Sequence, residues 1–526
     1  MIDRGSLIAF LLTLAAAVLV ISGTVPCSGQ GARSSALSTI NMSGDKAQNP
    51  ARPPAASPTK IKASFTMAAI GDLQGPREPI TRLSEPRFQK LIRLLREADV
   101  SFANQEGPLK AESAKTAVAE FKAMGFRMMS QANNHAMDNG APEMLTISNL
   151  LDDAGIVHAG SGKDLLQARS PSYLFTPKGA VGLVAIFAVD PNQVPQASQL
   201  SGATYPYGDH AGRPGVNALH LTPYYNVSEE QLHWLRSIRD SIYLPADASL
   251  PMPDHWLPGT SGYGNLGPNR VELFGTFYQV GQKVGSVTYT MHPDDLREIL
   301  KSVHAAKQYA DFVIVTIHAH QYSVAWQTKV ADGRIREAGV DDGVPDFLID
   351  LAHQAIENGA DAFIAGGVHT MRGIEIYEGK PVFYGMSNFI TMGMASPPVS
   401  AVRPTDQRSE GLTGEVSMAS DRILHRAPDG SWGAQAWGSF PNSLQAQLAT
   451  CTYEQGRLVE IRIYPVDLGL EASRPVSLLG VPMIPSPAIA QSILEKIQEL
   501  SKPLGTTISI EDDIGVIRIG NYATTP

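Results

Sequence analysis

The sequence predicts an α/β fold in which apolar strands alternate with amphipathic helices. Short apolar runs stop abruptly at Gly, Asn, Asp or His, as expected for strands buried on both faces. Between these runs, apolar residues recur at the spacing of a helix face. The composition, with 43% hydrophobic and 18% charged residues, is that of a soluble globular protein.

Length and charge limit the classes of protein that need to be considered. A chain of 526 residues is long enough for one large domain or two. Its formal net charge of −9 provides no basic surface for nucleic acid, so we predict no nucleic-acid partner. The two cysteines, Cys27 and Cys451, do not predict a structural disulfide because Cys27 lies in or beside a targeting segment.

The N-terminus has the pattern of an export signal. Arg4 precedes an apolar run, residues 7–21, and small residues follow it. We predict export to the periplasm or the extracellular space, with a signal over residues 1–27. The alternatives are an uncleaved membrane anchor and lipid attachment at Cys27. Residues 28–60 are poor in apolar side chains and are predicted to be a flexible linker.

The main domain is predicted over residues 61–395. Each of its expected strands is followed directly by a polar or glycine residue. The strands are Ala63–Ile70, Val100–Ala103, Gly125–Met129, Ile156–Gly160, Val181–Val189, Phe312–Ile317 and Ala362–Ala365, with a hairpin of Ile374–Tyr377 and Val382–Tyr384. Helical spacing predicts helices over Phe88–Leu95, Lys115–Lys122, Met144–Leu151, Pro293–His304 and Val344–Ile356.

Residues 191–285 interrupt this alternation. They are rich in Pro, Gly, Tyr and His, and only Ser228–Ile242 reads as a helix, so an irregular functional insertion is predicted. Its aromatic side chains, including Tyr207, Tyr224 and Trp234, either line a substrate cleft or form the insertion's own core. Residues 396–526 are predicted to be a small C-terminal α+β part of unknown role.

The loop Ser130–Gly140 is the first candidate for a functional site. Asn134 can offer an amide oxygen to a metal ion, His135 an imidazole to a substrate, and Asp138 a carboxylate that orients its neighbours. The alternative is an ordinary turn in which Asn and Asp bond their own backbone and cap the next helix.

Other strand ends repeat this pattern of polar residues. They carry Asp72, Asn104, Glu106, His318, His320 and His369. In an open α/β sheet such residues converge beyond the carboxyl ends of the strands. Carboxylate, amide and imidazole ligands suit Mn, Zn, Fe or Mg, and two such ions sharing a carboxylate would make a hydrolytic site. Taken singly, each residue has an ordinary structural explanation, such as a turn cap or a surface acid.

The ordered set of motifs resembles the capsule-synthesis CapA family, the poly-γ-glutamate biosynthesis proteins with a metallophosphatase-like fold. The motifs are Gly71-Asp72, Asn104-x-Glu106, Asn133-Asn-His-Ala-x-Asp138-x-Gly140, the strand-closing His318, Gly367-x-His369, and Gly373-Ile-Glu-Ile-Tyr-x-Gly-Lys-Pro-Val-Phe-Tyr-Gly-x-x-Asn388-Phe. The resemblance covers about residues 64–392 and implies a four-layered α/β/β/α sandwich of metallophosphatase type.

The resemblance also implies roles for individual residues. Asp72 and His369 would hold one metal ion, Glu106 would bridge, and Asn134 with His318 would hold the second. His135 would be the general acid, or would donate to the leaving oxygen. We expect Asn104 and Asn388 to contact the substrate.

Two departures from the family pattern bear on the second ion. Gly367-Val-His369 stands where the family commonly has His-Pro-His, and His318-Ala-His320 stands where it commonly has His-Trp-Gly. Either His320 replaces the lost ligand, which we favour, or the second ion is bound weakly or not at all.

The resulting hypothesis is an exported metal-dependent hydrolase that acts on or near an anionic cell-surface polymer or its precursor, beside capsule-assembly membrane proteins. A non-catalytic polymer-binding or assembly component on the same fold is one alternative. A metal-dependent peptidase or amidase is another, because the same site chemistry can attack a carbonyl.

Overall fold

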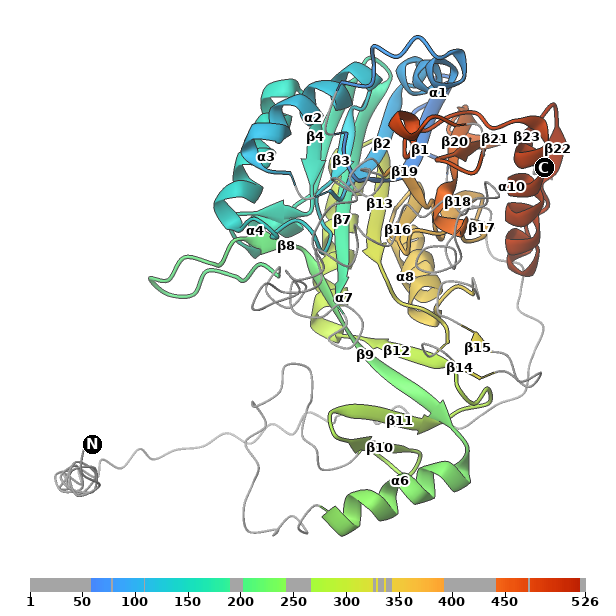
Figure 1. Ribbon diagram of the computed structural model, residues 1–526. Helices are drawn as coiled ribbons and strands as arrows, with labels where there is room; N and C mark the ends of the chain where they lie inside the picture. The colour runs from blue at the N-terminus through green and yellow to red at the C-terminus, as the bar shows by residue number, and fades with distance from the viewer. Residues whose placement is uncertain are drawn as a thin grey trace, which may run out of the picture. The chain divides into compact units, whose positions relative to one another are not determined.

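The computed structural model describes residues 58–76, 79–107, 109–189, 202–242, 266–324, 328–329, 335–336, 343–391, 441–471 and 474–520 (Figure 1). The predicted export signal 1–27 with Cys27, and the predicted linker up to residue 57, lie outside these ranges. All the described residues belong to one compact unit. Within the described ranges, no helix combines the length and the hydropathy that a membrane span requires.

The first sheet contains the N-terminal strands of the main domain. Its order is β22-β23-β21-β20-β1-β2-β3-β4, with β19 also paired to β1. The bounds are β1 Phe65–Leu73, β2 Val100–Gln105, β3 Met128–Ser130, β4 Val157–Ala159, β19 Asn388–Ile390, β20 Gln445–Glu454, β21 Arg457–Asp467, β22 Ser509–Glu511 and β23 Ile514–Arg518. Strands β1 to β4 are parallel, whereas β20 joins β1 in antiparallel fashion.

The second sheet has the order β10-β11-β9-β7-β13-β16-β18-β17, with β12 paired to β9 and β6 paired to β7. Its strands are β6 Ser172–Thr176, β7 Gly179–Val189, β9 Ala218–Val227, β10 Arg270–Leu273, β11 Thr276–Val280, β12 Val287–Met291, β13 Phe312–Ala319, β16 Ala362–Gly367, β17 Ile374–Tyr377 and β18 Lys380–Phe383. Two short pairs complete the strands, β5 Ser161–Gly162 with β8 Gly215–Val216 and β14 Thr328–Lys329 with β15 Ile335–Arg336.

Helices connect the parallel strands and cover the sheets. They are α1 Pro86–Glu97, α2 Ala111–Met124, α3 Ala141–Ala154, α4 Leu165–Arg169, α6 Glu229–Ile242, α7 Pro293–Tyr309, α8 Asp346–Glu357 and α10 Pro487–Ser501. The helical spacing of apolar residues predicted the buried faces of α1, α3 and α8 correctly, whereas α4 was not predicted. In α1, for example, Phe88, Leu91 and Leu95 are buried, and Pro86 occupies the first turn, where no amide hydrogen is needed.

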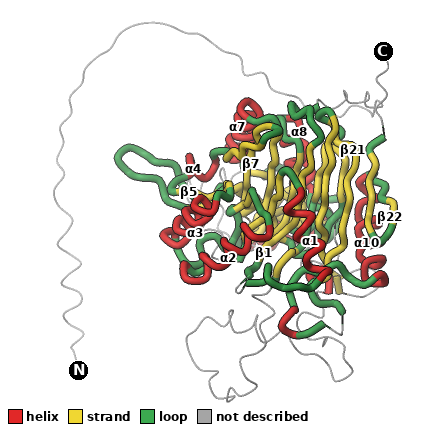
Figure 2. The backbone as a smooth tube through the Cα atoms, turned by 90° about the horizontal axis from the view of Figure 1, so that it is seen from above, coloured by secondary structure: helices red, strands yellow, loops and turns green. Residues whose placement is uncertain are grey.

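Three large clusters of buried apolar side chains join these elements. One contains side chains of β1, such as Phe65, and of β7 and β13, such as Phe187 and Phe312, so the two sheets pack against each other. A second lies between the first sheet and α1, α2 and α3. A third lies between the second sheet and α7 and α8. Figure 2 places α1 and α2 on one side of the strands and α7 and α8 on the opposite side. The predicted α/β fold is therefore confirmed.

The described part of the insertion 191–285 is more regular than predicted. Residues 190–201 and 243–265 lie outside the described ranges, but β9, β10 and β11 extend the second sheet. Pro223 is the reason that the sequence did not predict β9. Residues 218–220 pair with β7 and residues 224–227 with β11, so Pro223 lies between them and pairs only with β12. Of the aromatic side chains, Tyr224 is buried, whereas Tyr207 and Trp234 are exposed.

The described residues of the C-terminal region 396–526 complete the first sheet. Strand β20 pairs with β1 along five residues, Phe65 to Ala69, and β21, β23 and β22 follow in order. Helix α10 contributes Ile493, Leu494 and Ile497 to the cluster that lies between the two sheets. This region thus supplies strands and core to the main domain.

Candidate metal centre

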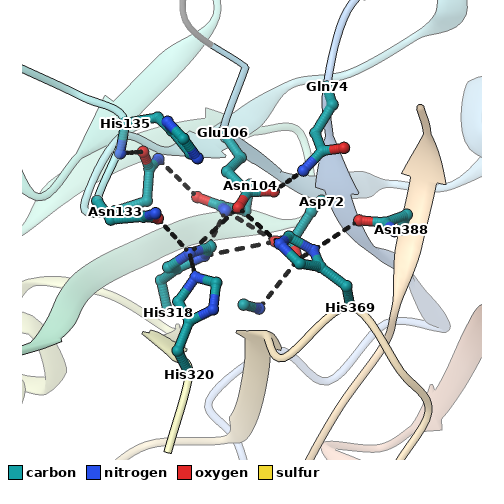
Figure 3. A network of polar contacts seen from close by, with 12 residues as sticks. Asp72, Gln74, Asn104, Glu106, Asn133, His135, His318, His320, His369 and Asn388 are labelled. Carbon is teal, nitrogen blue, oxygen red and sulfur yellow. Dashed lines mark hydrogen bonds and ion pairs between the residues drawn. The ribbon is translucent and has the colours of Figure 1, made fainter. Parts of the chain in front are cut away.

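Strand register brings the predicted site residues together. Asp72 at the end of β1 is directly beside Asn104 on β2 and beside Asn388 on β19. In the second sheet, His318 at the end of β13 is beside Gly366 on β16. The two sheets meet here, because the Gly367 amide donates to Asp72 Oδ2 at 2.9 Å. Figure 3 shows the resulting group of side chains.

Two acids and three histidines form the centre of the site. Asp72 and Glu106 are fully buried, and His318 is 2% exposed. Asp72 lies 3.6 Å from His318 Nδ1 and 3.5 Å from His369 Nδ1. Glu106 Oε1 lies 3.4 Å from His318 Nε2 and 3.2 Å from His369 Nε2. Residues that the sequence separates by nearly three hundred positions therefore lie in one cluster.

His320 points into the same group. Its Nε2 lies 3.0 Å from His318 Nε2, and its ring centroid is 5.2 Å from that of His369. Ligand atoms of Glu106, His320 and His369 lie within 4.8 Å of one another, as do those of Asp72, Glu106 and His318. Glu106 belongs to both sets, so its carboxylate is placed to be shared.

Three asparagines frame these groups. The Asn104 amide nitrogen donates to Asp72 Oδ1 at 2.8 Å and lies 2.9 Å from His318 Nδ1, which accepts. Asn133 donates to Asn104 Oδ1 at 3.3 Å and accepts from the His135 backbone amide at 3.1 Å. Asn134 Oδ1 accepts from His318 Nε2 at 2.9 Å. Asn104 was expected to contact substrate, but both ends of its buried amide are bonded within the protein, which gives it an orienting position.

Asn388 has a similar position. Its Oδ1 accepts from His369 Nδ1 at 2.8 Å, and its amide nitrogen donates to the Ser443 carbonyl at 3.4 Å. This hydrogen bond leaves His369 Nε2 to face Glu106. The His369 backbone has a positive φ of 56°, so the loop after β16 holds this histidine in an uncommon conformation for a residue with a Cβ.

One glycine makes room for the Asp72 carboxylate. A Cβ added to Gly366 would lie 2.8 Å from Asp72 Oδ1, closer than any real van der Waals contact. Only a residue without a side chain allows β16 to pass this close to the acid.

His135 and Asp138 form a pair at the edge of this group. His135 Nδ1 donates to Asp138 Oδ2 at 2.7 Å, and the two side chains are 35% and 27% exposed, unlike the buried acids. Burial opposes protonation of His135, but the Asp138 hydrogen bond and the Glu106 charge outweigh it and raise the pKa of His135 above its ordinary value.

The charges of the site set its other protonation states. Burial disfavours the Asp72 carboxylate, yet hydrogen bonds and charge from His318 and His369 outweigh it, so the pKa of Asp72 lies far below its ordinary value. Burial likewise opposes the His369 imidazolium, but Glu106 and Asp72 raise the pKa of His369 to about 9. For His320, burial and the neighbouring histidines lower the pKa well below its ordinary value, which leaves a neutral imidazole.

The chemistry of these donors fits metal ions. Glu106 Oε1 is buried and makes no hydrogen bond; among the described residues its charge is balanced only by the histidines at 3.2 and 3.4 Å, a position that a bound metal cation could take over. Two carboxylates, three imidazoles and the Asn134 oxygen provide the hard and borderline ligands that Mn, Zn, Fe and Mg bind.

Sequence reasoning missed Gln74, which donates to Glu106 Oε2 at 3.0 Å. It also did not assign a role to Asn133, although that residue stands in the central motif. The only sequence signal for Gln74 is its position two residues after Asp72, directly after the end of β1.

Comparison with known proteins identifies the family. The model of a family described as bacterial capsule synthesis protein PGA_cap matches residues 66–392. The chain belongs to this family. The match includes all the candidate ligands, from Asp72 to His369, and Asn388. The resemblance to the CapA capsule-synthesis proteins is thereby confirmed, and with it a relation to capsule synthesis.

Two curated relatives come from Sinorhizobium fredii and are named uncharacterized protein y4sH and uncharacterized protein y4uA. Each is 34% identical to this chain over 480 residues, which cover 88% of this chain and 94% of the relative. The similarity extends well beyond residues 66–392. These relatives therefore also resemble this chain in regions that the family model does not match.

Proposed function

We propose that this capsule-synthesis family member is a metal-dependent hydrolase with a two-ion site of phosphoester type. The observation that carries the proposal is the position of Glu106 Oε1, a buried carboxylate oxygen without a hydrogen-bond partner, between His318 and His369. The layered packing of helices and sheets supports a second part of the proposal, that the fold is the four-layered α/β/β/α sandwich of metallophosphatase type.

The two groups of ligand atoms that lie within 4.8 Å of one another support one division of the ligands. Glu106 would be shared, Asp72 and His318 would hold one ion, and His320 and His369 the other. Asn134 would complete the set beside His318, its oxygen being 2.9 Å from His318 Nε2. This division keeps Glu106 as the bridge that the family resemblance implies. The resemblance pairs Asp72 with His369, whereas this division pairs Asp72 with His318 and His369 with His320. His320 thereby takes the place of the missing ligand.

Two ions bound there would lower the pKa of a shared water and draw electron density from a phosphoryl or acyl oxygen of the substrate. The chain itself supplies a proton. Asp138 fixes the His135 ring through Nδ1, and the raised pKa of His135 favours the protonated imidazole, which can donate to a leaving oxygen. Asn104, Asn133 and Asn388 hold the ligands in place, which reduces the reorganisation needed during the reaction.

The family and the N-terminal pattern support a cellular role. The family description supports a substrate that is an anionic cell-surface polymer, such as poly-γ-glutamate or capsule, or its precursor. The export pattern of residues 1–27 supports a location in the periplasm or outside the cell, either released or tethered through the N-terminus, beside capsule-assembly membrane proteins.

Metal content and turnover of the full chain test this function. Purified protein loaded with Mn²⁺ or Zn²⁺ is assayed with bis(p-nitrophenyl) phosphate and with a γ-glutamyl anilide, beside E106Q and H135Q. The control is H353Q, since His353 bonds Glu375 on a different part of the chain. We expect hydrolysis of the phosphodiester, its loss in E106Q, and reduction by about 100-fold or more in H135Q, as for removal of a general acid.

The same assay separates the alternatives. Cleavage of the γ-glutamyl substrate alone would indicate an amidase or peptidase. Bound metal without turnover of either substrate, together with polymer binding that survives H135Q, would indicate a non-catalytic component. Protein that binds no transition metal would refute the proposal.

A further inference from the structure

Gln74 lies beside Glu106 because β1 and β2 end in register. Leu73 pairs with Gln105, and the Leu73 carbonyl accepts from both the Glu106 and the Gly107 amides, at 3.2 and 3.0 Å. A Cβ on Gly107 would lie 3.1 Å from the Gln74 Cα, so the glycine permits this close approach. The next pair of side chains along the register is Gln74 and Glu106.

The Gln74 side chain holds one oxygen of the Glu106 carboxylate. Its amide nitrogen donates to Glu106 Oε2 at 3.0 Å, and both side chains are buried (Figure 3). Gln74 bonds Oε2, while the other oxygen, Oε1, faces His318 and His369. The Gln74 hydrogen bond is thus made to the carboxylate oxygen that does not face the ligand histidines.

Packing does not explain an amide at position 74. Gln74 Oε1 is buried without a hydrogen-bond partner, and leaving an amide oxygen unsatisfied costs free energy. Methionine has nearly the same volume and would avoid this cost. A lysine or arginine would neutralise Glu106, and an acid would repel it, whereas glutamine donates a hydrogen bond and leaves the full negative charge for a cation.

We propose that Gln74 is a positioning residue of the metal centre, which orients Glu106 so that its carboxylate can be shared by two ions. This inference rests on the proposed function, since it concerns the carboxylate that would bridge. Gln74 would contact no reacting atom. It would act through Glu106 alone.

Manganese binding to the full chain tests the inference without any activity assay. Paramagnetic resonance of Mn²⁺ measures the free ion and also detects the spin coupling of two ions that share a ligand. The variants are Q74M, which removes the donor, and Q74E, which keeps the side-chain shape but does not donate when ionised. The matched control is Q447M. Gln447 is also buried, donates to the Gly385 carbonyl at 3.2 Å and has an Oε1 without a partner, but it bonds no site carboxylate.

We expect wild-type protein and Q447M to bind two coupled ions. In Q74M and Q74E the coupled signal should disappear and Mn²⁺ affinity should fall by about 10- to 100-fold, the usual effect of removing a residue that orients a ligand. If Q74M shows no thermal unfolding transition and is therefore not folded, the comparison of Mn²⁺ binding between Q74E and wild-type protein tests the inference instead.

The possible failures are distinguishable. Coupled binding in Q74M and Q74E equal to wild type would overturn the role of Gln74 and leave the proposed function standing. An equal loss of coupled Mn²⁺ binding in Q447M would also overturn the role of Gln74, since replacing any buried glutamine would then have the same effect. Wild-type protein that binds no Mn²⁺, or a single ion, would overturn the two-ion function and this inference together.

Discussion

Metal binding to this site should release a proton from His369. In the metal-free protein Glu106 and Asp72 raise the pKa of His369 to about 9, because His369 Nε2 lies 3.2 Å from Glu106 and Nδ1 lies 3.5 Å from Asp72. An imidazole binds a cation only in its neutral form, so the ion must displace this proton.

The size of the effect follows from the pKa. At pH 7 the solution is two units below a pKa of about 9, which corresponds to a penalty of about 2.7 kcal/mol, or about 100-fold in affinity. His320 adds no such penalty, since its lowered pKa keeps it neutral. Apparent affinity should therefore rise about tenfold from pH 7 to pH 8 and level off above about pH 9.

Titration calorimetry measures both quantities. The full chain is titrated with Mn²⁺ at pH 7 and pH 8, in two buffers with different ionisation enthalpies, and the difference in heat gives the number of protons released. H135Q is the control, because the pKa of His135 is also raised but His135 is not a proposed ligand. H135Q should release the same proton as wild type.

An affinity that is constant between pH 7 and pH 8, with no buffer-dependent heat, would refute this reasoning. So would loss of the proton release in H135Q, since the proton would then come from the His135–Asp138 pair.

Three further predictions concern single residues. In G366A the new methyl group would lie 2.8 Å from Asp72 Oδ1, so Mn²⁺ affinity should fall by about tenfold or more; unchanged affinity in the same titration would contradict a close approach of β16. N388L removes the acceptor of His369 Nδ1 and should weaken Mn²⁺ binding by about 10- to 100-fold, whereas an effect on melting temperature alone would argue against an orienting role. D295N should cost about 3 kcal/mol of unfolding free energy in urea at neutral pH, because Asp295 accepts from the buried Arg169 at 3.1 Å. Burial opposes ionisation of Asp295, but His220 and Arg169 outweigh it and lower its pKa from 3.8 to about 2, so this stability is complete above pH 3.8 and lost as the pH falls through about 2. A D295N deficit that does not shrink over that range would contradict the assignment.

Buried strands and amphipathic helices were predictable because each has a local pattern. The apolar run of β7 and the helix face of α8, for example, are readable without any partner. Strand β20 was not predicted, although it pairs with β1. It contains Gln, Ala, Thr and Cys, and its two faces join different clusters, with Leu448 in one and Cys451 in the other. Such small or polar residues become core only when both covering layers are present.

The candidate ligands were predictable because each follows an apolar run, and parallel strands bring their carboxyl ends to one edge. The residues that form hydrogen bonds to these ligands were not predictable. The sequence could not show whether Asn104 and Asn388 orient ligands or contact a substrate. The answer depends on which atoms lie within 3 Å of their side-chain amides. Gln74 was missed for the same reason, since its role exists only through the Leu73–Gln105 register.

The sequence by itself determined the α/β class, the order of the main strands and helices, the family, and the set of side chains able to bind metal ions. Those properties depend on residue type and on spacing along the chain. Only the tertiary structure decided that Glu106 is common to two ligand groups, that His320 faces His318, and that Gln74 orients Glu106. These are distances between atoms on different strands, and they are set by sheet register and by the packing of one sheet on the other.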